Sequence, residues 1–165
     1  MGYIDQNLIS GEAVAYKARM HWIIFVQPLL FTIVFVGIAA LMFYLSIEKV
    51  PEHATLLRWL GAASIAAAIV PLFAAAVARA SAEFAVTNKR VILKTGFIQK
   101  KTAEMFLNKI ESVGVDQSIA GRVCGYGTIV LRGTGGTLEP FHRVSAPLEF
   151  RRQIQEQIGK TFSTA

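Results

Sequence analysis

Charged side chains are missing from two long stretches of this 165-residue sequence, residues 22–47 and residues 59–78. Because a helix rises about 1.5 Å per residue, about 20 apolar residues are enough to cross a hydrocarbon layer roughly 30 Å thick. A soluble helix of this length is expected to carry a charged face, and neither stretch has one. The missing charge therefore predicts an integral membrane protein with two transmembrane helices, at about 22–46 and 57–79, in a hairpin spanning 22–80.

Cysteine and histidine are also scarce, which limits disulfide and metal chemistry. Cys124 is the only cysteine, so the chain cannot form an internal disulfide, in keeping with a reducing cytoplasm. We interpret Cys124 as a small packed hydrophobe rather than as a redox sensor. His21, His53 and His142 fall on three different segments, one of them predicted to lie across the membrane from the other two. The sequence therefore predicts no shared metal site.

The sequence also lacks any pattern that is typical of catalysis. Gly125-x-Gly127 and Gly133-x-Gly135 superficially match nucleotide-binding glycines. A dinucleotide-binding loop must open a helix, whereas the first pair leads into a β-rich run and the second lies in a predicted hairpin turn. The spacing suggests no constellation centred on a serine, a cysteine or a carboxylate. We therefore predict no enzymatic activity and no cofactor.

The charges that are present are concentrated toward the C-terminus. The net charge is +6, and the 13 basic and 7 acidic residues from Arg79 onward account for all of it. Because cytoplasmic flanks of membrane helices are enriched in Lys and Arg, we expect both termini to be cytoplasmic and the loop 46–58 to face outward. A positive domain beside the inner leaflet favours anionic lipid or acidic partners over nucleic acid. The candidate lipid- or partner-binding residues are Arg90, Lys94, Lys100, Lys101, Arg122, Arg132 and Arg143.

The second uncharged stretch is rich in small residues, beginning with the run Gly61-Ala62-Ala63-Ser64. Small side chains let helix backbones approach closely in lipid. Alanine alone hardly drives membrane insertion, so we expect this helix to pack against the first helix or against a neighbouring subunit.

The segment that follows the hairpin has the pattern of a small β-domain, residues 81–160, with a short tail at 161–165. Residues 83–87 and 90–94 flank Asn88-Lys89, a candidate tight turn because Asn tolerates positive φ. Regularly spaced short strands with glycine turns predict a sandwich or small barrel. The further strand candidates are 97–103, 105–107, 110–115, 128–132 and 137–143.

The last predicted element is a helix that would plug one open end of this barrel. Ser145 and Pro147 suit a helix start. The apolar residues expected to share one face of the helix are Leu148, Phe150, Ile154 and Ile158.

Four runs of the segment, taken in order, resemble a known family. They are residues 84–92 (FAVTNKRVI), Gly96-Phe97, residues 108–113 (NKIESV) and residues 125–129 (GYGTI). The series is similar to the bacterial pleckstrin-homology-like (PH-like) domain of the membrane-anchored, YdbS-like type, over roughly residues 81–158. The resemblance implies an α+β protein of the bacterial inner membrane, with a two-helix transmembrane hairpin and a PH-like β-barrel or sandwich capped by a C-terminal α-helix. It implies no established enzymatic activity and no defined ligand, and it does not explain the extra basic pair Lys100-Lys101.

The N-terminal segment, residues 1–21, is predicted to supply a strand to the same domain. Between residues 11 and 19 the side chains alternate, with Val14, Tyr16 and Ala18 on one face. Related PH-like domains often begin with such a Gly-Glu strand. Because both ends of a membrane hairpin emerge on one side, we expect this strand to pair with residues 83–87, with the hairpin inserted between the first two strands.

Three classes of function fit these features. The first is a recognition or scaffold module at the cytoplasmic face of the inner membrane that binds a protein partner or anionic lipid. The second is an assembly protein that forms a homo-oligomer through the alanine-rich helix or through exposed edge strands. The alternative is an accessory subunit of a membrane transport or enzyme complex.

Overall fold

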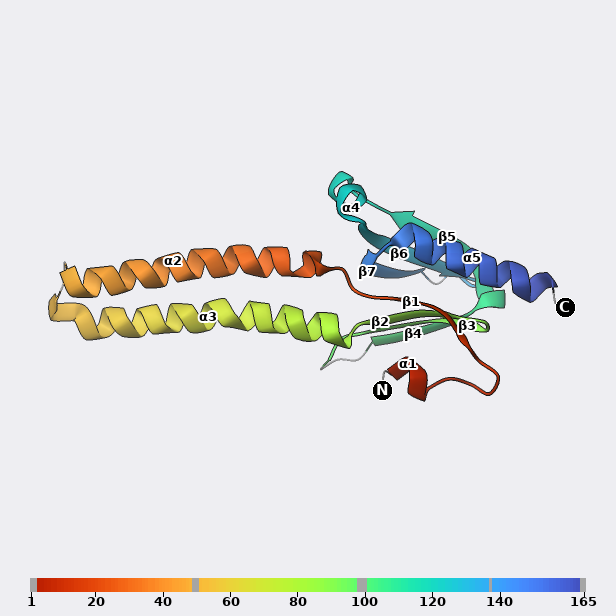
Figure 1. Cartoon of the computed structure of the whole chain (residues 1–165), viewed down its shortest axis with the longest axis horizontal. Coiled ribbons are helices and arrows are strands. Elements are labelled where there is room, and N and C mark those ends of the chain that lie inside the picture. Colours follow the sequence, from red (N-terminus) through yellow and green to blue (C-terminus); the bar gives the residue numbers. More distant parts are fainter. Residues whose placement is uncertain (1–2, 49–50, 98–100, 137, 164–165) are drawn as a thin grey trace. The chain divides into compact units, whose positions relative to one another are not determined.

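A computed structural model of the chain describes residues 3–48, 51–97, 101–136 and 138–163 (Figure 1). The chain divides into two compact units. One is Trp22–Val77, and the other combines Met1–His21 with Ala78–Ala165. The predicted α+β class is confirmed, because one unit is a pair of long apolar helices and the other consists of antiparallel sheets with a C-terminal helix.

The helical unit is a hairpin. The 3₁₀ turn η1 (Trp22–Phe25) leads into α2 (Val26–Glu48), and the 3₁₀ turn η2 (Pro51–His53) leads into α3 (Ala54–Ser81). The second helix begins a few residues before the predicted start at 57, because the residues that follow η2 are all compatible with a helix.

Small residues form the contact between the two helices. The buried residues of α3 are Gly61, Ser64, Ala68 and Ala75. Their spacing of three, four and seven residues places them on one face of α3. A Cβ atom on Gly61 would lie 3.5 Å from the backbone oxygen of Ala39, and Ser64 Oγ donates to the carbonyl of Phe35 at 2.8 Å. Helix α3 therefore packs against α2, which is the first of its two expected partners.

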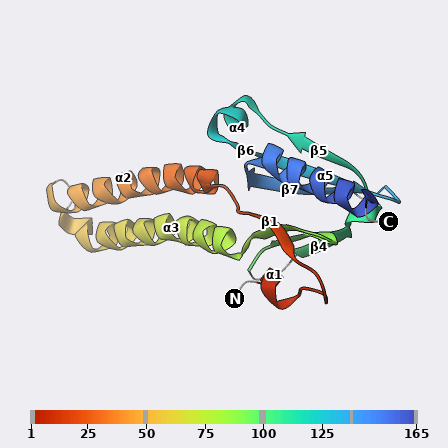
Figure 2. The ribbon, with the colours of Figure 1, turned by 45° about the vertical axis from the view of Figure 1, so that its right-hand side comes forward.

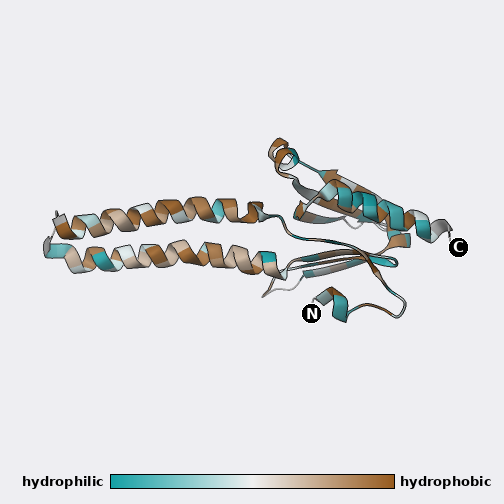
Figure 3. Ribbon diagram, viewed as in Figure 1, coloured by the Kyte–Doolittle hydropathy of each residue, from teal (hydrophilic) through white to brown (hydrophobic). Residues whose placement is uncertain are grey.

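The remaining faces of both helices are largely apolar and exposed (Figure 3). Trp59 and Phe73, for example, are 73% and 69% exposed. The most apolar windows of the two helices have hydropathies of 2.4 and 2.2, and only 6% and 22% of those windows is buried. A core helix of a soluble protein would bury such side chains. The chain thus has two helices that are long and apolar enough to cross a membrane, which indicates a membrane protein.

The other unit contains two antiparallel sheets (Figures 1 and 2). The first has the order β1 (Val14–Ala18), β2 (Glu83–Thr87), β3 (Arg90–Thr95) and β4 (Lys101–Phe106). The 3₁₀ turn η3 (Leu107–Lys109) connects it to the second sheet, which has the order β5 (Ile110–Asp116), β6 (Tyr126–Gly133) and β7 (Leu138–Ser145). A short helix, α4 (Ile119–Cys124), precedes β6, and α5 (Pro147–Ser163) follows β7.

Strand β1 pairs antiparallel with β2, which is the pairing expected for residues 11–19. The helical hairpin lies in the chain between these two strands. Beyond β1 the chain continues to the second sheet, where Met20 forms an isolated bridge with Val144. The N-terminal segment thereby connects the two sheets.

Helix α5 covers the core between the sheets, as Figure 2 shows. Phe150 and Ile154 are fully buried there, and Ile158 packs beside them. Leu148 was expected on the same face, but it is 54% exposed. The expectation was wrong because two residues that are two positions apart lie about 200° apart around a helix, so Leu148 faces away from Phe150.

A smaller core lies on the other face of the first sheet. Ile4, from the short helix α1 (Tyr3–Gln6), is buried against Ile92. The first two backbone N–H groups of α1 donate to the Glu83 carboxylate at 3.0 and 3.2 Å. Strands β2 and β3 are thus covered on both faces, and for this reason their apolar residues run continuously instead of alternating.

The two-residue turn Asn88-Lys89 between β2 and β3 is present, but not with positive φ at Asn88. Thr87 Oγ1 instead accepts hydrogen bonds from the backbone N–H groups of Lys89 (3.2 Å) and Arg90 (2.9 Å). The Asn88 side chain accepts from the backbone of Ala13 at 2.9 Å. The turn is therefore stabilised by side chains that also bind the N-terminal segment.

Arg90 lies buried beneath that segment. Its Nε and Nη2 atoms donate to the two carboxylate oxygens of Glu12 at 3.0 and 3.1 Å, and Nη2 also donates to the carbonyl of Asn7 at 2.6 Å. Its Nη1 atom pairs with Glu104. The side chain of Glu12 is 0% exposed and that of Arg90 is 8% exposed. These contacts hold the N-terminal segment on the sheet.

The environment of Glu12 keeps its carboxylate ionised. Burial by itself raises the pKa of Glu12. Hydrogen bonds from Arg90, from the backbone of Ile9 and from Thr87, together with the charge of Arg90, outweigh burial, so the pKa is lowered below its ordinary value of 4.5.

We expect Arg90→Met to destabilise the sheet unit by about 3–5 kcal/mol, because it leaves the Glu12 carboxylate buried without its partner. The measurement is the thermal or denaturant unfolding of the purified chain in detergent. Arg132→Met, which removes the same charge from an exposed position on β6, is the matched control. Equal stability of the two variants would contradict the structural role of Arg90.

The lowered pKa of Glu12 predicts an acid-sensitive fold. A carboxylate whose pKa is depressed on folding contributes stability above its unfolded pKa, and the contribution is lost as the pH falls through the folded pKa. We expect the melting temperature to fall as the pH drops below about 4.5. Part of this fall should be absent in Glu12→Gln, which melts at a lower temperature at neutral pH. An unchanged pH dependence in the variant would refute the assignment.

Candidate functional site

Two cavities, of about 760 and 650 Å³, adjoin between β4 and β7 and beside the start of β6. Met20 and His142 line both of them, so we treat them as one groove, the β4–β7 groove. Its charged and hydroxyl-bearing lining residues are Thr95, Lys101, Thr102, Glu139, Asp116, Ser118, Thr128, Tyr126 and Arg143.

A β-bulge shapes the wall of the groove. Opposite Thr128 on β6, strand β7 places two residues, His142 and Arg143. Thr128 Oγ1 lies 3.1 Å from His142 Nδ1. Arg143 has a φ of +59°, a left-handed conformation that costs a residue with a side chain about 1–2 kcal/mol. The bulge therefore presents His142 and Arg143 to the groove from a strained backbone.

The segment that follows β1 contacts the backbone of the bulge. The backbone N–H of His21 donates to the carbonyl of Arg143 at 2.8 Å. The His21 ring is buried and stacks on Tyr126, with ring centroids 5.3 Å apart. Burial lowers the pKa of His21, a hydrogen bond to the backbone of Cys124 acts in the opposite direction, and the positive charge of Arg79 lowers it further. His21 is therefore neutral at pH 7, and its role here is structural: its ring packs on Tyr126 and its backbone binds Arg143.

Of the basic residues predicted from the sequence, Lys101 and Arg143 line this groove. Both are exposed. Glu139 and Asp116 also line it, so the groove presents both cationic groups and carboxylate acceptors. Such a lining suits a ligand that has a phosphate together with hydroxyl or ammonium donors.

Arg90 and Lys94, two of the predicted binding residues, make contacts within the fold and do not line the groove. Arg90 is buried in its network with Glu12 and Glu104. Lys94 Nζ lies 3.8 Å from Glu83 and 4.8 Å from the centre of the Tyr3 ring. Both positions contact the N-terminal segment, and the local sequence around β3 does not predict these contacts.

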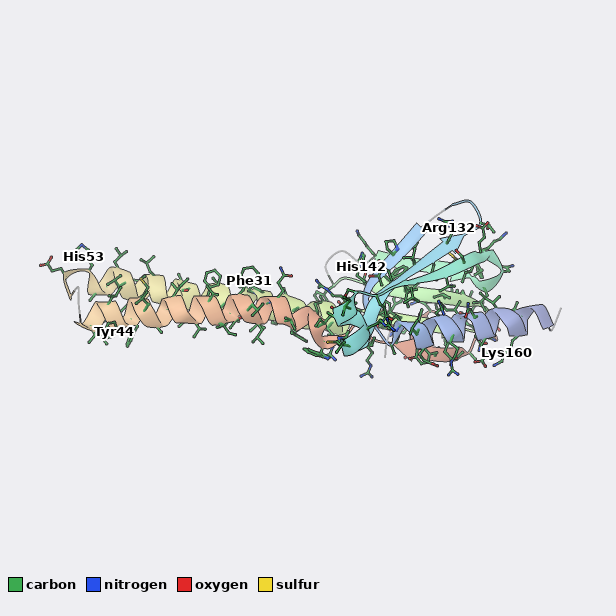
Figure 4. The ribbon with its side chains drawn as sticks, turned by 90° about the horizontal axis from the view of Figure 1, so that it is seen from above. Phe31, Tyr44, His53, Arg132, His142 and Lys160 are labelled. Atoms are coloured by element: carbon green, nitrogen blue, oxygen red, sulfur yellow. The ribbon has the colours of Figure 1, made fainter. Side chains whose placement is uncertain are left out.

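The other basic candidates lie elsewhere. Arg122 is exposed on α4. Arg132 is exposed on β6, four residues beyond Thr128 and hence roughly 13 Å along the strand from the bulge; Figure 4 labels Arg132 and His142. Lys100 falls outside the described residues. Two of the seven predicted residues thus line the groove, Lys101 in the larger cavity and Arg143 in the smaller one. The groove adds His142, which the sequence analysis considered only as a possible metal ligand.

Helix α4 was not predicted, although the sequence carries signals for it. Ser118 is its N-cap, with Oγ accepting from the backbone of Gly121 at 3.1 Å, and Gly125 ends it in the left-handed conformation. A Cβ atom at Gly121 would lie 2.6 Å from the backbone oxygen of Tyr126, so only glycine fits there. Gly125, which the sequence analysis placed before a β-rich run, is the C-cap of this helix.

Among the described residues, no group of three or more His, Cys, Asp or Glu side chains is placed to hold a metal ion.

Comparison with known proteins gave one match. The family model described as Bacterial PH domain matches residues 23–158, a span that contains both long helices and reaches into α5. A search of curated proteins found no match, and a search of solved structures found none.

The strained bulge leads to a prediction about Arg143. We expect Arg143→Gly to raise the free energy of unfolding by about 0.5–1 kcal/mol, because glycine adopts positive φ without steric cost. Arg143→Ala, which removes the charge and keeps the strain, should leave stability close to that of the original chain. Denaturant unfolding in detergent measures both. A loss of stability in Arg143→Gly would contradict this expectation, because it would mean that contacts of the arginine side chain stabilise the left-handed conformation.

Proposed function

As the chain belongs to the bacterial PH domain family, we propose that it is a membrane-anchored, non-enzymatic recognition module whose β4–β7 groove binds anionic lipid headgroups. In this proposal both termini are cytoplasmic and the module works at the cytoplasmic face of the bacterial inner membrane.

The observation that carries the proposal is the bulge in β7. Backbone strain persists where the surrounding structure enforces it, and it is concentrated at binding sites. Here the strained residue is an arginine, Arg143, exposed at a groove that Lys101 lines from β4. Two cations on one groove are suited to bind a phosphate group.

The carboxylates of the groove favour a particular kind of headgroup. Glu139 and Asp116 would repel a ligand that carries only negative charge. A headgroup with hydroxyl groups beside its phosphate, such as glycerol phosphate, satisfies both sets of residues, because the hydroxyls donate to the carboxylates while the phosphate accepts from the cations.

The connectivity also favours a ligand in the anchoring membrane. The apolar hairpin lies in the chain between β1 and β2, so the sheet unit is joined to it by two covalent connections. Tethering raises the effective concentration of lipid headgroups at the unit, and a modest intrinsic affinity is then sufficient for occupancy.

To test the proposal, the full chain in a mild detergent is titrated with short-chain phosphatidylglycerol or phosphatidylcholine, and bound lipid is counted by native mass spectrometry. We expect preferential retention of phosphatidylglycerol. The double variant Lys101→Ala/Arg143→Ala should bind it about tenfold more weakly or worse, because charge-assisted hydrogen bonds contribute about 1.5–3 kcal/mol each.

Arg132→Ala is the matched control, since it removes one exposed positive charge from β6 without touching the groove. Phosphatidylethanolamine, with an ammonium donor beside its phosphate, tests how far the carboxylates select the headgroup. Equal retention of phosphatidylglycerol and phosphatidylcholine by the original chain would refute the proposal and would favour a protein partner.

Self-association or docking to another membrane subunit has separate support in the hairpin. A cavity of about 500 Å³ lies on the helical unit, and its lining includes the exposed small residues Ala40 and Ala62 beside the larger side chains of Val36, Phe43 and Ile65. Small residues on a membrane helix allow a further helix to approach closely. This surface is the part of the molecule best suited to a homo-oligomer or to an accessory-subunit role.

A further inference from the structure

Helix α4 carries an apolar surface that the proposed headgroup groove does not use. Ile119 and Val123 are 87% and 84% exposed, which makes them the most exposed large apolar side chains in the described part of the chain. They are four residues apart and therefore lie on the same face of the helix. Figure 3 shows α4 as largely hydrophobic in colour.

The helix is held rigidly in this position. The Ser118 cap, the left-handed Gly125 and the close approach of Gly121 to Tyr126 fix both of its ends and its inner side. Neither Ile119 nor Val123 is buried, so packing within the described part of the chain does not explain why α4 carries two β-branched apolar residues at these positions.

One residue that contacts α4 lies directly before the hairpin in the chain. His21 stacks on Tyr126 and hydrogen-bonds to the backbone of Cys124, the last residue of α4. The next residue, Trp22, begins the first candidate membrane span. His21, which contacts α4, is thus joined directly to the first residue of the candidate span, whose Cα atom follows that of His21 by about 3.8 Å.

The second connection returns to the same place. Arg79 Nε, at the end of α3, donates to the carbonyl of Met20 at 3.3 Å. Met20 immediately precedes His21, so both connections to the hairpin meet beside the residue that supports α4. Residues on both connections therefore contact one another beside His21, the residue that contacts α4.

We propose that α4 inserts Ile119 and Val123 into the interfacial region of the anchoring bilayer. The exposed Arg122 between them would remain at headgroup level, where a cation is attracted to anionic lipid. Apolar residues buried in the interface with a basic residue beside them are the pattern of an interfacial anchor. The helix would then fix the orientation of the sheet unit and present the β4–β7 groove toward headgroups.

The single cysteine allows a direct test. Cys124 was interpreted from the sequence as a packed residue, but it is exposed on α4, so it can be labelled with an environment-sensitive NBD fluorophore in the full chain reconstituted into vesicles. We expect blue-shifted emission and strong quenching by lipids that carry a nitroxide near the headgroup, with weaker quenching by a nitroxide deep in the acyl chain. Ile119→Ser/Val123→Ser should shift the emission to the red and reduce quenching at least twofold.

The reference is Cys124→Ser/Gln155→Cys, which places the label on an exposed position of α5. The label there should stay unquenched. Unquenched fluorescence at Cys124 in the original chain, or equal quenching in the double serine variant, would overturn the proposal. Both serine substitutions are at exposed positions, and an unchanged melting temperature establishes that the variant is folded.

The experiment separates this inference from the proposed lipid-binding function. In vesicles of phosphatidylcholine alone the groove has no anionic ligand, yet insertion of α4 by its apolar side chains should persist. Conversely, Lys101→Ala/Arg143→Ala should lose phosphatidylglycerol selectivity and keep the quenching at Cys124. Loss of quenching in the absence of anionic lipid would refute apolar insertion.

Discussion

The structure depends on one covalent constraint, which is that a hairpin of two long apolar helices is inserted between two adjacent strands. Neighbouring strands lie about 4.8 Å apart, whereas packed helices lie about 8–10 Å apart. The β1–β2 ladder therefore holds the two ends of the hairpin close together, and the helices must pack closely soon after they leave it. The buried small residues of α3, with Gly61 beside the backbone of Ala39, allow this close packing.

The same constraint makes the N-terminal segment essential to the fold. Strand β1 is far from the rest of its sheet in sequence, so the entropy of closing the intervening loop opposes its pairing. The Arg90–Glu12 pair and the Asn88 contacts offset this cost by fastening the residues just before β1 to the β2–β3 turn. Because every buried side-chain nitrogen or oxygen in the described part of the chain has a hydrogen-bond partner, the buried charges are tolerated.

The two proposed membrane-facing features share one support. The segment Met20-His21 pairs with β7 at the bulge and contacts the end of α4. The strained Arg143 and the apolar face of α4 are thus fixed by the residues that lead into the first candidate span.

The sequence by itself determined the elements whose physics is local. Two uncharged runs long enough to cross a bilayer predicted the hairpin, and the alternation of residues 11–19 predicted a strand, because length, charge and side-chain period act within a few residues. Phe150 and Ile154 were placed correctly on the core face of α5 for the same reason. The capping residues Ser118 and Gly125 are also local signals, so α4 could have been predicted from the sequence. The pairing of the 11–19 strand with residues 83–87 was expected from the resemblance to PH-like domains and from the two hairpin ends emerging on one side, and it is confirmed.

Only the tertiary structure decided which basic residues are available to a ligand. Arg90 and Lys101 look alike in sequence, but Glu12, 78 residues from Arg90 along the chain, removes the first from solvent and leaves the second exposed at the groove. The bulge at Arg143 likewise arises from the register between β6 and β7, and the local sequence pattern does not predict it. Partner choice across long sequence separations is set by packing in three dimensions, and for that reason composition and periodicity do not reveal it.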